Sequence, residues 1–189
     1  MSLVLAFDCE TTGKADFSRS PEAEQQPRMV QLAAILLDEE WREVGILSAV
    51  FSPSVPISDE VAKIHGITQE KAQKCGIAET APLAVFDSWL KLADIAVAHN
   101  FDFDVFMLSR NSPGRRAKLI SKGFCTMKAM APVCKLPGQY DDYKWPKLSE
   151  AWKYCFPRAR LPNMHDALGD ARACAAVYRW LQSEKPARA

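Results

Sequence analysis

The feature that most constrains this chain is a short apolar run that ends in acids. The segment Leu3-Val4-Leu5-Ala6-Phe7 is unbroken in its apolar character, and Asp8 and Glu10 follow it directly. Such a run is typical of a strand that is buried on both faces, so we expect a central strand with both carboxylates at or just past its carboxyl end. Ionised carboxylates in an apolar setting are costly unless a cation compensates them. A shared pair of divalent metal ions is the simplest compensation.

The chain has 189 residues, of which 48% are hydrophobic and 25% charged, and this composition predicts one globular domain over residues 1–189. No apolar stretch approaches the roughly 20 residues of a membrane helix, and no basic leader precedes the first strand, so we expect a cytoplasmic protein. The six cysteines are scattered without a Cys-x-x-Cys pair. We expect them to be reduced thiols, mostly buried, and not a zinc site.

Periodicity and turn residues place the other elements. We expect strands at 29–37, 43–51 and 95–98, the first two forming an antiparallel hairpin, after a polar loop at 14–27. Helices are expected from Ser58 or Asp59 toward Gly66, from Thr68, over 82–92, from Phe103 to Arg110, and over 115–160 with interruptions at Pro132, Pro137, Pro146 and Pro157. The clearest helix is the last, over 166–182, where apolar residues recur at three- and four-residue steps.

Three separated segments carry acids that one metal site can use. Residues two apart in an extended strand project to the same side, so Asp8 and Glu10 can share a metal pair while Cys9 turns away. Asp170 lies on the apolar stripe of the last helix, three residues after Ala167, and therefore points toward the core. Hard oxygen ligands of this kind favour Mg²⁺ or Mn²⁺, and such a site indicates phosphodiester hydrolysis.

Two further segments supply an acid and a base. Of Asp102 and Asp104 we choose Asp104 as the ligand, because it shares the inward side of its helix with Met107 and Leu108, and we leave Asp102 as a helix cap or an indirect contributor. His165 is five residues before Asp170, a rotation of roughly 140° on a helix, so it belongs to the loop before the last helix. With an ordinary pKa near 6.5 it can accept a proton from an attacking water. Asn100 can position a loop or a ligand through its amide.

Together these segments resemble the DnaQ-like 3′–5′ exonucleases, the DEDDh group of the ribonuclease H-like fold. Asp8 and Glu10 match the first motif, D-x-E-T-T-G, and the segment from His99 to Asp104 is similar to the second, H-N-x-x-F-D. His165-x-x-x-x-Asp170 resembles the third motif in its histidine form. The segments Ile64-His65-Gly66-Ile67-Thr68, Cys125-Thr126-Met127 and Lys147-Leu148-Ser149 agree as well.

The resemblance implies an α/β fold with a five-stranded mixed sheet flanked by helices, and an enzyme that uses two Mg²⁺ or Mn²⁺ ions. It implies Asp8, Glu10, Asp104 and Asp170 as metal ligands and His165 as general base. It also implies substrate contacts at four positions, which are Thr11, Thr12, His65 and Asn100. The polar residues after Leu181 hold no sign of a polymerase-binding extension, and the oligomeric state is not encoded in any pattern we recognise.

The charge distribution fits a polyanionic substrate. Residues 1–100 hold 8 Lys and Arg against 15 Asp and Glu, whereas residues 110–160 hold 12 against 3. The aromatic and basic segment from Leu136 to Pro146 either grips a single strand or anchors a long loop. We expect single-stranded DNA 3′ ends as the substrate. The alternatives are RNA ends, a small-nucleotide phosphohydrolase, and a nucleic-acid-binding module without catalysis.

Overall fold

The computed structural model describes residues 2–110, 112–139, 142–162 and 164–183. Within these ranges the strands are β1 Val4–Thr11, β2 Met29–Leu37, β3 Glu43–Val50, β4 Ile95–Ala98 and β5 Gly123–Cys125. The helices are α1 Asp59–His65, α2 Gln69–Cys75, α3 Thr80–Leu92, α4 Phe101–Leu108, α5 Pro113–Lys122, α6 Thr126–Cys134, α7 Leu148–Cys155 and α8 Ala167–Ser183.

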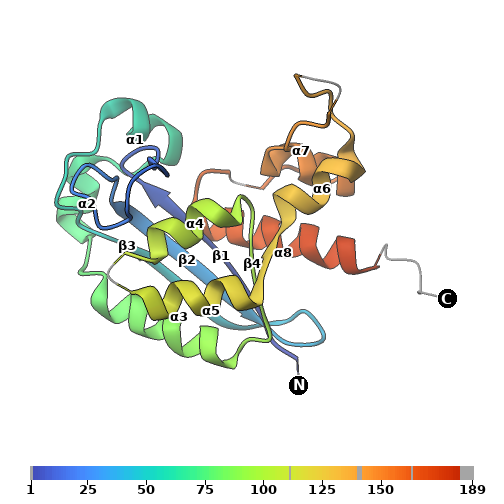
Figure 1. Cartoon of the computed structure of the whole chain (residues 1–189), viewed down its shortest axis with the longest axis horizontal. Helices are drawn as coiled ribbons and strands as arrows, with labels where there is room; N and C mark the ends of the chain where they lie inside the picture. The colour runs from blue at the N-terminus through green and yellow to red at the C-terminus, as the bar shows by residue number, and fades with distance from the viewer. Residues whose placement is uncertain (1, 111, 140–141, 163, 184–189) are drawn as a thin grey trace.

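The strands form one mixed sheet in the order β3-β2-β1-β4-β5 (Figure 1). β1 to β3 are antiparallel neighbours, whereas β1 pairs with β4, and β4 with β5, in parallel. The five-stranded mixed sheet that the resemblance implied is therefore confirmed, as is the hairpin of β2 and β3. β1 lies at the centre because Leu5, Ala6 and Phe7 are fully buried, as an apolar run covered on both faces requires.

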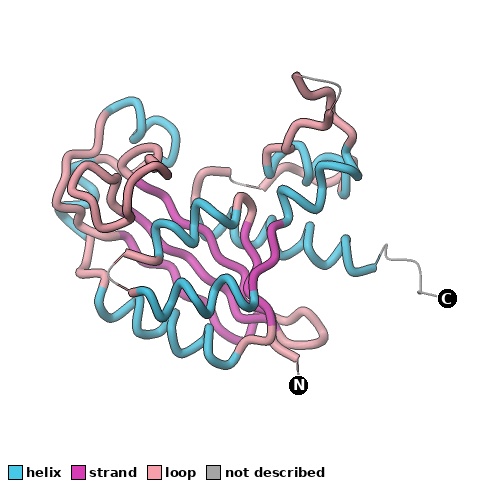
Figure 2. The backbone as a smooth tube through the Cα atoms, viewed as in Figure 1, coloured by secondary structure: helices cyan, strands magenta, loops and turns pink. Residues whose placement is uncertain are grey.

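Helices cover the two faces of the sheet unequally (Figure 2). On one face, α3, α4 and α5 pack their apolar residues against Leu5, Phe7 and Cys9 of β1. On the other face, α8 packs Cys174, Ala175 and Tyr178 against Val4 and Ala6 of the same strand. The alternation along β1 therefore sends odd-numbered side chains to one layer and even-numbered ones to the other. Asp8 and Glu10 continue the even-numbered row, toward the α8 side.

α6 and α7 lie beside α8 and form a separate part of the molecule at the upper right of Figure 1. A small core of Met130, Ala151, Cys155 and Val177 joins the three helices. His99 at the end of β4 also connects this part to the sheet. Its Nδ1 lies 2.9 Å from the Thr126 hydroxyl and its Nε2 2.9 Å from the Pro146 carbonyl oxygen. This part of the chain is thus attached to the carboxyl end of the parallel strands.

Two sequence expectations for residues 115–160 are wrong. Residues 123–125 form the edge strand β5, not helix, and Pro132 lies inside α6 rather than interrupting it. Pro132 has no N–H to donate to the Lys128 carbonyl oxygen, so α6 continues past it with one backbone hydrogen bond fewer. α4 also begins two residues earlier than expected, which places Asp102 and Asp104 together in its first turn.

No helix in the described part of the chain is long and apolar enough to cross a membrane.

Candidate active site

The first acid pair lies within β1 rather than beyond it, because the strand continues to Thr11. Both side chains face the start of α8, and Cys9 faces the opposite layer, as the two-residue period predicts. Burial raises the pKa of Asp8 well above its usual range, and the neighbouring carboxylates of Asp104, Asp170 and Glu10 raise it further. The carboxylates that add to this shift come from β1 itself and from two other segments, so four acids converge at one place.

Asp104 reaches this place from α4, on the opposite layer. Its Oδ1 accepts hydrogen bonds from the Cys9 backbone N–H at 3.0 Å and from the Cys9 thiol at 3.2 Å. β1 pairs with β4 only as far as Ala6, so no backbone carbonyl of β4 accepts the Cys9 N–H. The Asp104 carboxylate accepts it instead. Burial raises the pKa of Asp104 to about 8 despite these two bonds. These two hydrogen bonds fix the position of the Asp104 carboxyl group.

Asp170 and His165 complete the cluster at the start of α8. One ligand atom each from Glu10, His165 and Asp170 lies within 4.8 Å of the others. Asp170 Oδ2 accepts the His165 backbone N–H at 3.1 Å, whereas Asp170 Oδ1 is buried without a hydrogen-bond partner. Burial raises the pKa of Glu10 to about 7, with Asp170 and Asp166 adding to the shift. His165 lies before the helix, as predicted.

The donor set fits a divalent cation. Carboxylate oxygens suit Mg²⁺ or Mn²⁺, and the unpartnered Asp170 Oδ1 is a buried acceptor that such an ion would satisfy. Among the described residues, no lysine or arginine forms an ion pair with any of the four acids. The basic charge needed to neutralise the cluster therefore does not come from these side chains.

Asp102 does not belong to the cluster. It is exposed and pairs with Lys128 on α6. It is not the cap of α4 either, because the N-cap position is Asn100. Choosing Asp104 over Asp102 thus agrees with the geometry, although the role left open for Asp102 as a helix cap is wrong.

The four residues expected to contact substrate differ from one another in their burial and hydrogen bonds. The Thr11 hydroxyl donates to the Gly13 carbonyl oxygen at 2.6 Å, and Thr12 Oγ1 accepts the Arg28 backbone N–H at 3.0 Å. The Thr12 hydroxyl proton is not used in that bond and can be donated elsewhere. Asn100 is exposed at the end of β4, with a left-handed backbone (φ 70°) and no side-chain capping bond.

His65 is as buried as Thr11, and each is 8% exposed. The Nδ1 of His65 accepts the Ile67 backbone N–H at 3.1 Å, and its Nε2 has no partner that meets hydrogen-bond geometry. Burial lowers the pKa of His65, although the nearby Thr11 backbone opposes the shift. Because Nδ1 accepts the Ile67 N–H, the neutral form of the ring carries its proton on Nε2. It lies beside the end of β1 rather than in open solvent.

Sequence reasoning missed two residues beside the site, Gln31 and Asp166. Gln31 on β2 is the cross-strand partner of Glu10 and is buried. Its Nε2 donates to Asp166 Oδ1 at 2.9 Å, and its Oε1 accepts the Ala167 backbone N–H at 3.2 Å. The available signal was a glutamine inside the otherwise apolar run of β2, since a buried amide needs partners.

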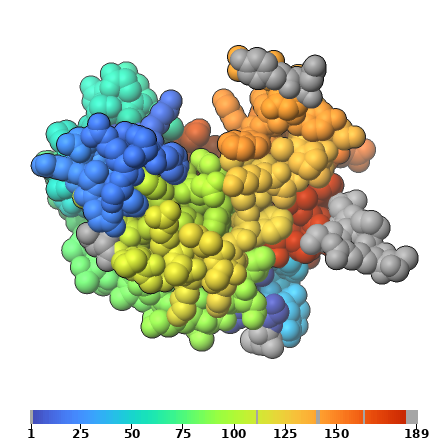
Figure 3. All heavy atoms as spheres, viewed as in Figure 1, coloured from blue at the N-terminus to red at the C-terminus, as the bar shows by residue number. Residues whose placement is uncertain are grey.

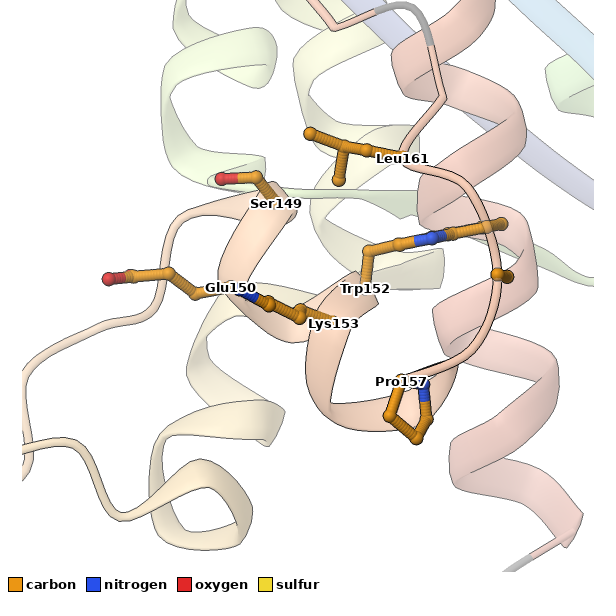
Figure 4. Close-up of a pocket in the computed structure, with 7 residues that line it drawn as sticks. Ser149, Glu150, Trp152, Lys153, Pro157 and Leu161 are labelled. Atoms are coloured by element: carbon orange, nitrogen blue, oxygen red, sulfur yellow. The ribbon is translucent and has the colours of Figure 1, made fainter.

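One face of the molecule is hollowed. Figure 3 shows a depression between the loop after β1 (blue) and the α6–α7 part of the chain (orange), with α4 (yellow-green) visible within it. A separate pocket of about 470 Å³ lies between α7 and the segment that follows it, and none of the four acids lines it (Figure 4). Trp152 and Leu161 line that pocket.

Comparison with known proteins agrees with this geometry. Residues 5–178 match the model of the RNase_T family, described as exonuclease. The chain belongs to this exonuclease family. The resemblance to DnaQ-like exonucleases that the motifs indicated is therefore confirmed. A comparison with curated proteins finds none similar enough to count as a relative.

Solved structures of exonuclease I share the fold. E. coli exonuclease I in complex with a dT13 oligonucleotide aligns with a TM-score of 0.75 at 22% identity, over 98% of this chain and 42% of that one. The zinc-bound E. coli exonuclease I–ssDNA complex aligns with a TM-score of 0.68 at 21% identity, over 99% and 42%. An exonuclease I/SSB-Ct complex aligns with a TM-score of 0.69 at 19% identity, over 98% and 42%. This chain therefore spans less than half the length of those proteins, and the likeness establishes the ribonuclease H-like fold.

Proposed function

We propose that this exonuclease domain hydrolyses single-stranded DNA from its 3′ end with the help of two divalent ions, Mg²⁺ or Mn²⁺. The observation that carries the proposal is the convergence of Asp8, Glu10, Asp104 and Asp170 at the carboxyl end of β1, with Asp170 Oδ1 buried and unpartnered. A purely structural cluster would not place Glu10, Asp104 and Asp170 where each of them raises the proton affinity of Asp8.

The four acids would hold the ions, and Asp8 would be shared because it interacts with the other three. Two divalent ions supply an activated water and stabilise negative charge on the scissile phosphate and the leaving 3′-oxygen. Asp104 is kept in place by the two bonds from Cys9. Asp170 in turn fixes the backbone of the His165 loop.

His165 would act as the general base. Its ring is exposed at the edge of the cluster and close to Glu10 and Asp170, so it can take a proton from an attacking water and release it to solvent. Its placement before α8, and not within it, leaves the ring free to face the substrate side.

The substrate contacts would come from the residues around the depression. Thr12 can donate its hydroxyl proton and Asn100 its exposed amide, and the backbone at Thr11 would pack against the terminal nucleotide, with His65 supporting it. One observation favours single-stranded DNA over RNA, namely the DNA oligonucleotide complexes of the structural neighbours. The basic residues between 110 and 160 favour a polyanion of either kind.

The test is digestion of matched 5′-labelled single-stranded DNA and RNA with Mg²⁺, Mn²⁺ or chelator, with Asp8→Ala alongside. We expect a metal-dependent ladder that shortens from the 3′ end of DNA, and no ladder with Asp8→Ala. Faster shortening of RNA would overturn the choice of sugar. If only small phosphate esters or neither polymer were cleaved, the exonuclease proposal itself would be wrong.

A further inference from the structure

Gln31 connects the strand that faces Glu10 to the loop that carries His165. Its Cα is paired with that of Glu10 across β1 and β2, so both side chains lie on the α8 side of the sheet. The Gln31 side chain is almost fully buried, at 6% exposure. It is the only long polar side chain in β2, a strand whose nine residues are all buried.

Both ends of the Gln31 carboxamide are used, and both main bonds go to residues directly after His165. Nε2 donates to Asp166 Oδ1 at 2.9 Å, and Oε1 accepts the Ala167 N–H at 3.2 Å. Nε2 also lies 3.5 Å from the Ser48 hydroxyl on β3, at the limit of a hydrogen bond. Asp166 is further fixed by the Gly169 N–H, which donates to its Oδ2 at 3.3 Å.

The backbone at His165 requires such support. His165 has φ 64°, a left-handed conformation that is strained for residues other than glycine and persists only where the surroundings enforce it. The loop is held on one side by Asp170, which accepts the His165 N–H. On the other side the carboxamide of Gln31 holds the next two residues.

We propose that Gln31 is a positioning residue for His165: by bonding Asp166 and Ala167 it keeps the His165 loop in the left-handed conformation that directs the imidazole at the acid cluster. The consequence for turnover rests on the proposed function, whereas the consequence for the loop does not. Gln31 itself touches neither substrate nor water in this mechanism.

The hydrogen bond between Gln31 and Asp166 can be tested by exchanging the donor and the acceptor between the two positions. In Gln31→Glu two carboxylates meet, at positions 31 and 166, with no proton between them. In Gln31→Glu combined with Asp166→Asn, the asparagine amide can donate to the glutamate, its oxygen can accept the Gly169 N–H, and the glutamate can accept the Ala167 N–H. The total charge of the site is then the same as in the natural chain.

We expect Gln31→Glu to lower kcat on single-stranded DNA about tenfold or more with KM changed less than threefold, because a small misplacement of a catalytic group has a large effect on rate. The double variant should recover kcat to within about threefold of the natural chain. In a His165→Ala background Gln31→Glu should have little further effect, because it acts through that residue. Equal loss in both backgrounds, or no recovery in the double variant, would overturn the proposal.

Hydrogen exchange of the metal-free protein gives a readout that does not require activity. The peptide that spans Ala167 should exchange faster in Gln31→Glu and return to the natural rate in the double variant. The matched control is Leu36→Ala on the same strand, whose buried side chain lies at the far end from the site. It should lower Tm without changing kcat or the exchange of this peptide.

The two proposals fail separately. If the natural chain cleaves no polymer, the proposed function is wrong, and the exchange rates still decide whether Gln31 holds the loop. If the natural chain cleaves DNA but the exchange of the loop is unchanged in Gln31→Glu, the inference about Gln31 is wrong and the proposed function is unaffected.

Discussion

One oxygen of the Asp104 carboxyl group accepts hydrogen bonds, whereas burial disfavours the ionised form of the group. Oδ1 accepts two hydrogen bonds from Cys9, while burial raises the pKa of the carboxyl group to about 8. Asp104→Asn keeps an oxygen for these bonds and removes the charge. We therefore expect the metal-free variant to unfold at a Tm several degrees above that of the natural chain, and to have no nuclease activity.

Asp104→Ala is the control for this prediction, because it removes the charge and the acceptor together. The Cys9 N–H is then buried without a partner, which costs about 1–3 kcal/mol. The alanine variant should unfold below the asparagine variant in thermal melts. If both variants melted at the same temperature, the bonds from Cys9 would contribute nothing to the stability of this site.

His165 contributes to the reaction through its ring, whereas its backbone contributes to the loop. His165→Ala should lower kcat on single-stranded DNA by about 10²–10⁴, the usual effect of losing a general base. The four acids remain, so Mg²⁺ affinity measured by calorimetry should change much less than the rate. Equal loss of metal affinity and rate would instead make His165 a ligand, a role that its proximity to Glu10 and Asp170 permits geometrically.

At the scale of residues, the sequence predicts the acids well because each interrupts an apolar pattern. Asp170 could be assigned to the core from its position on the helix stripe, and its exposure of 9% agrees. The hydrogen bonds that orient the acids could not be predicted from the sequence. Cys9 was predicted only to turn away from the site. Its thiol contact with Asp104, 95 residues further along the chain, depends on β4 ending at Ala98.

α8 is the element whose packing sets the position of Asp170. Ala171, which follows it, is fully buried, and the helix meets β1 through small residues. Ala171→Val adds two methyl groups where there is no space for them, so we expect a loss of about 1–3 kcal/mol in the free energy of unfolding. Because the helix must shift away from β1, activity should fall as well. Urea unfolding and initial rates measure the two effects.

Ala176→Val on the same helix is the matched control. Its side chain is only partly buried, and the cost of valine in a helix is the same at both positions. This variant should lose less than about 1 kcal/mol and keep full activity. An equal loss in the two variants would show that helix propensity, and not packing against β1, explains the effect at Ala171.

Elements are predictable from the sequence when their own pattern is long enough. The limits of β2 and β4 agree with the expectation, and α8 differs from it by one residue at each end. β5 has three residues and no period to recognise. It is a strand only because it pairs with Ala96, Val97 and Ala98 of β4, and its Gly123 admits the ring of Phe101, which a Cβ atom would meet at 2.4 Å. Such a long-range requirement is absent from local sequence.

The whole molecule holds a cluster of carboxyl groups that favours protons when no metal is bound. The pKa is about 7 for Glu10 and about 8 for Asp104 in the folded chain, against 4.5 and 3.8 as ordinary values. Between these pH values the folded state therefore keeps protons that the unfolded chain has released. The contribution of the two carboxyl groups to the free energy of unfolding is complete below their ordinary pKa values of 4.5 and 3.8, and it is lost as the pH rises through 7 and 8.

We expect the free energy of unfolding of the chelator-treated protein to fall between pH 5 and pH 8, by about 1.4 kcal/mol per pH unit for each proton that only the folded state retains. Exposed acids with lowered pKa, such as Asp94, are already ionised throughout this window and do not contribute to the slope. Mg²⁺ should restore stability, and more at pH 8 than at pH 5, because it binds the ionised carboxylates and competes with protons for them. Urea unfolding at both pH values, with chelator or Mg²⁺, measures this. In Asp104→Asn the free energy of unfolding should change less with pH. A free energy of unfolding independent of pH in the natural chain would mean that the acids do not repel one another as their positions require.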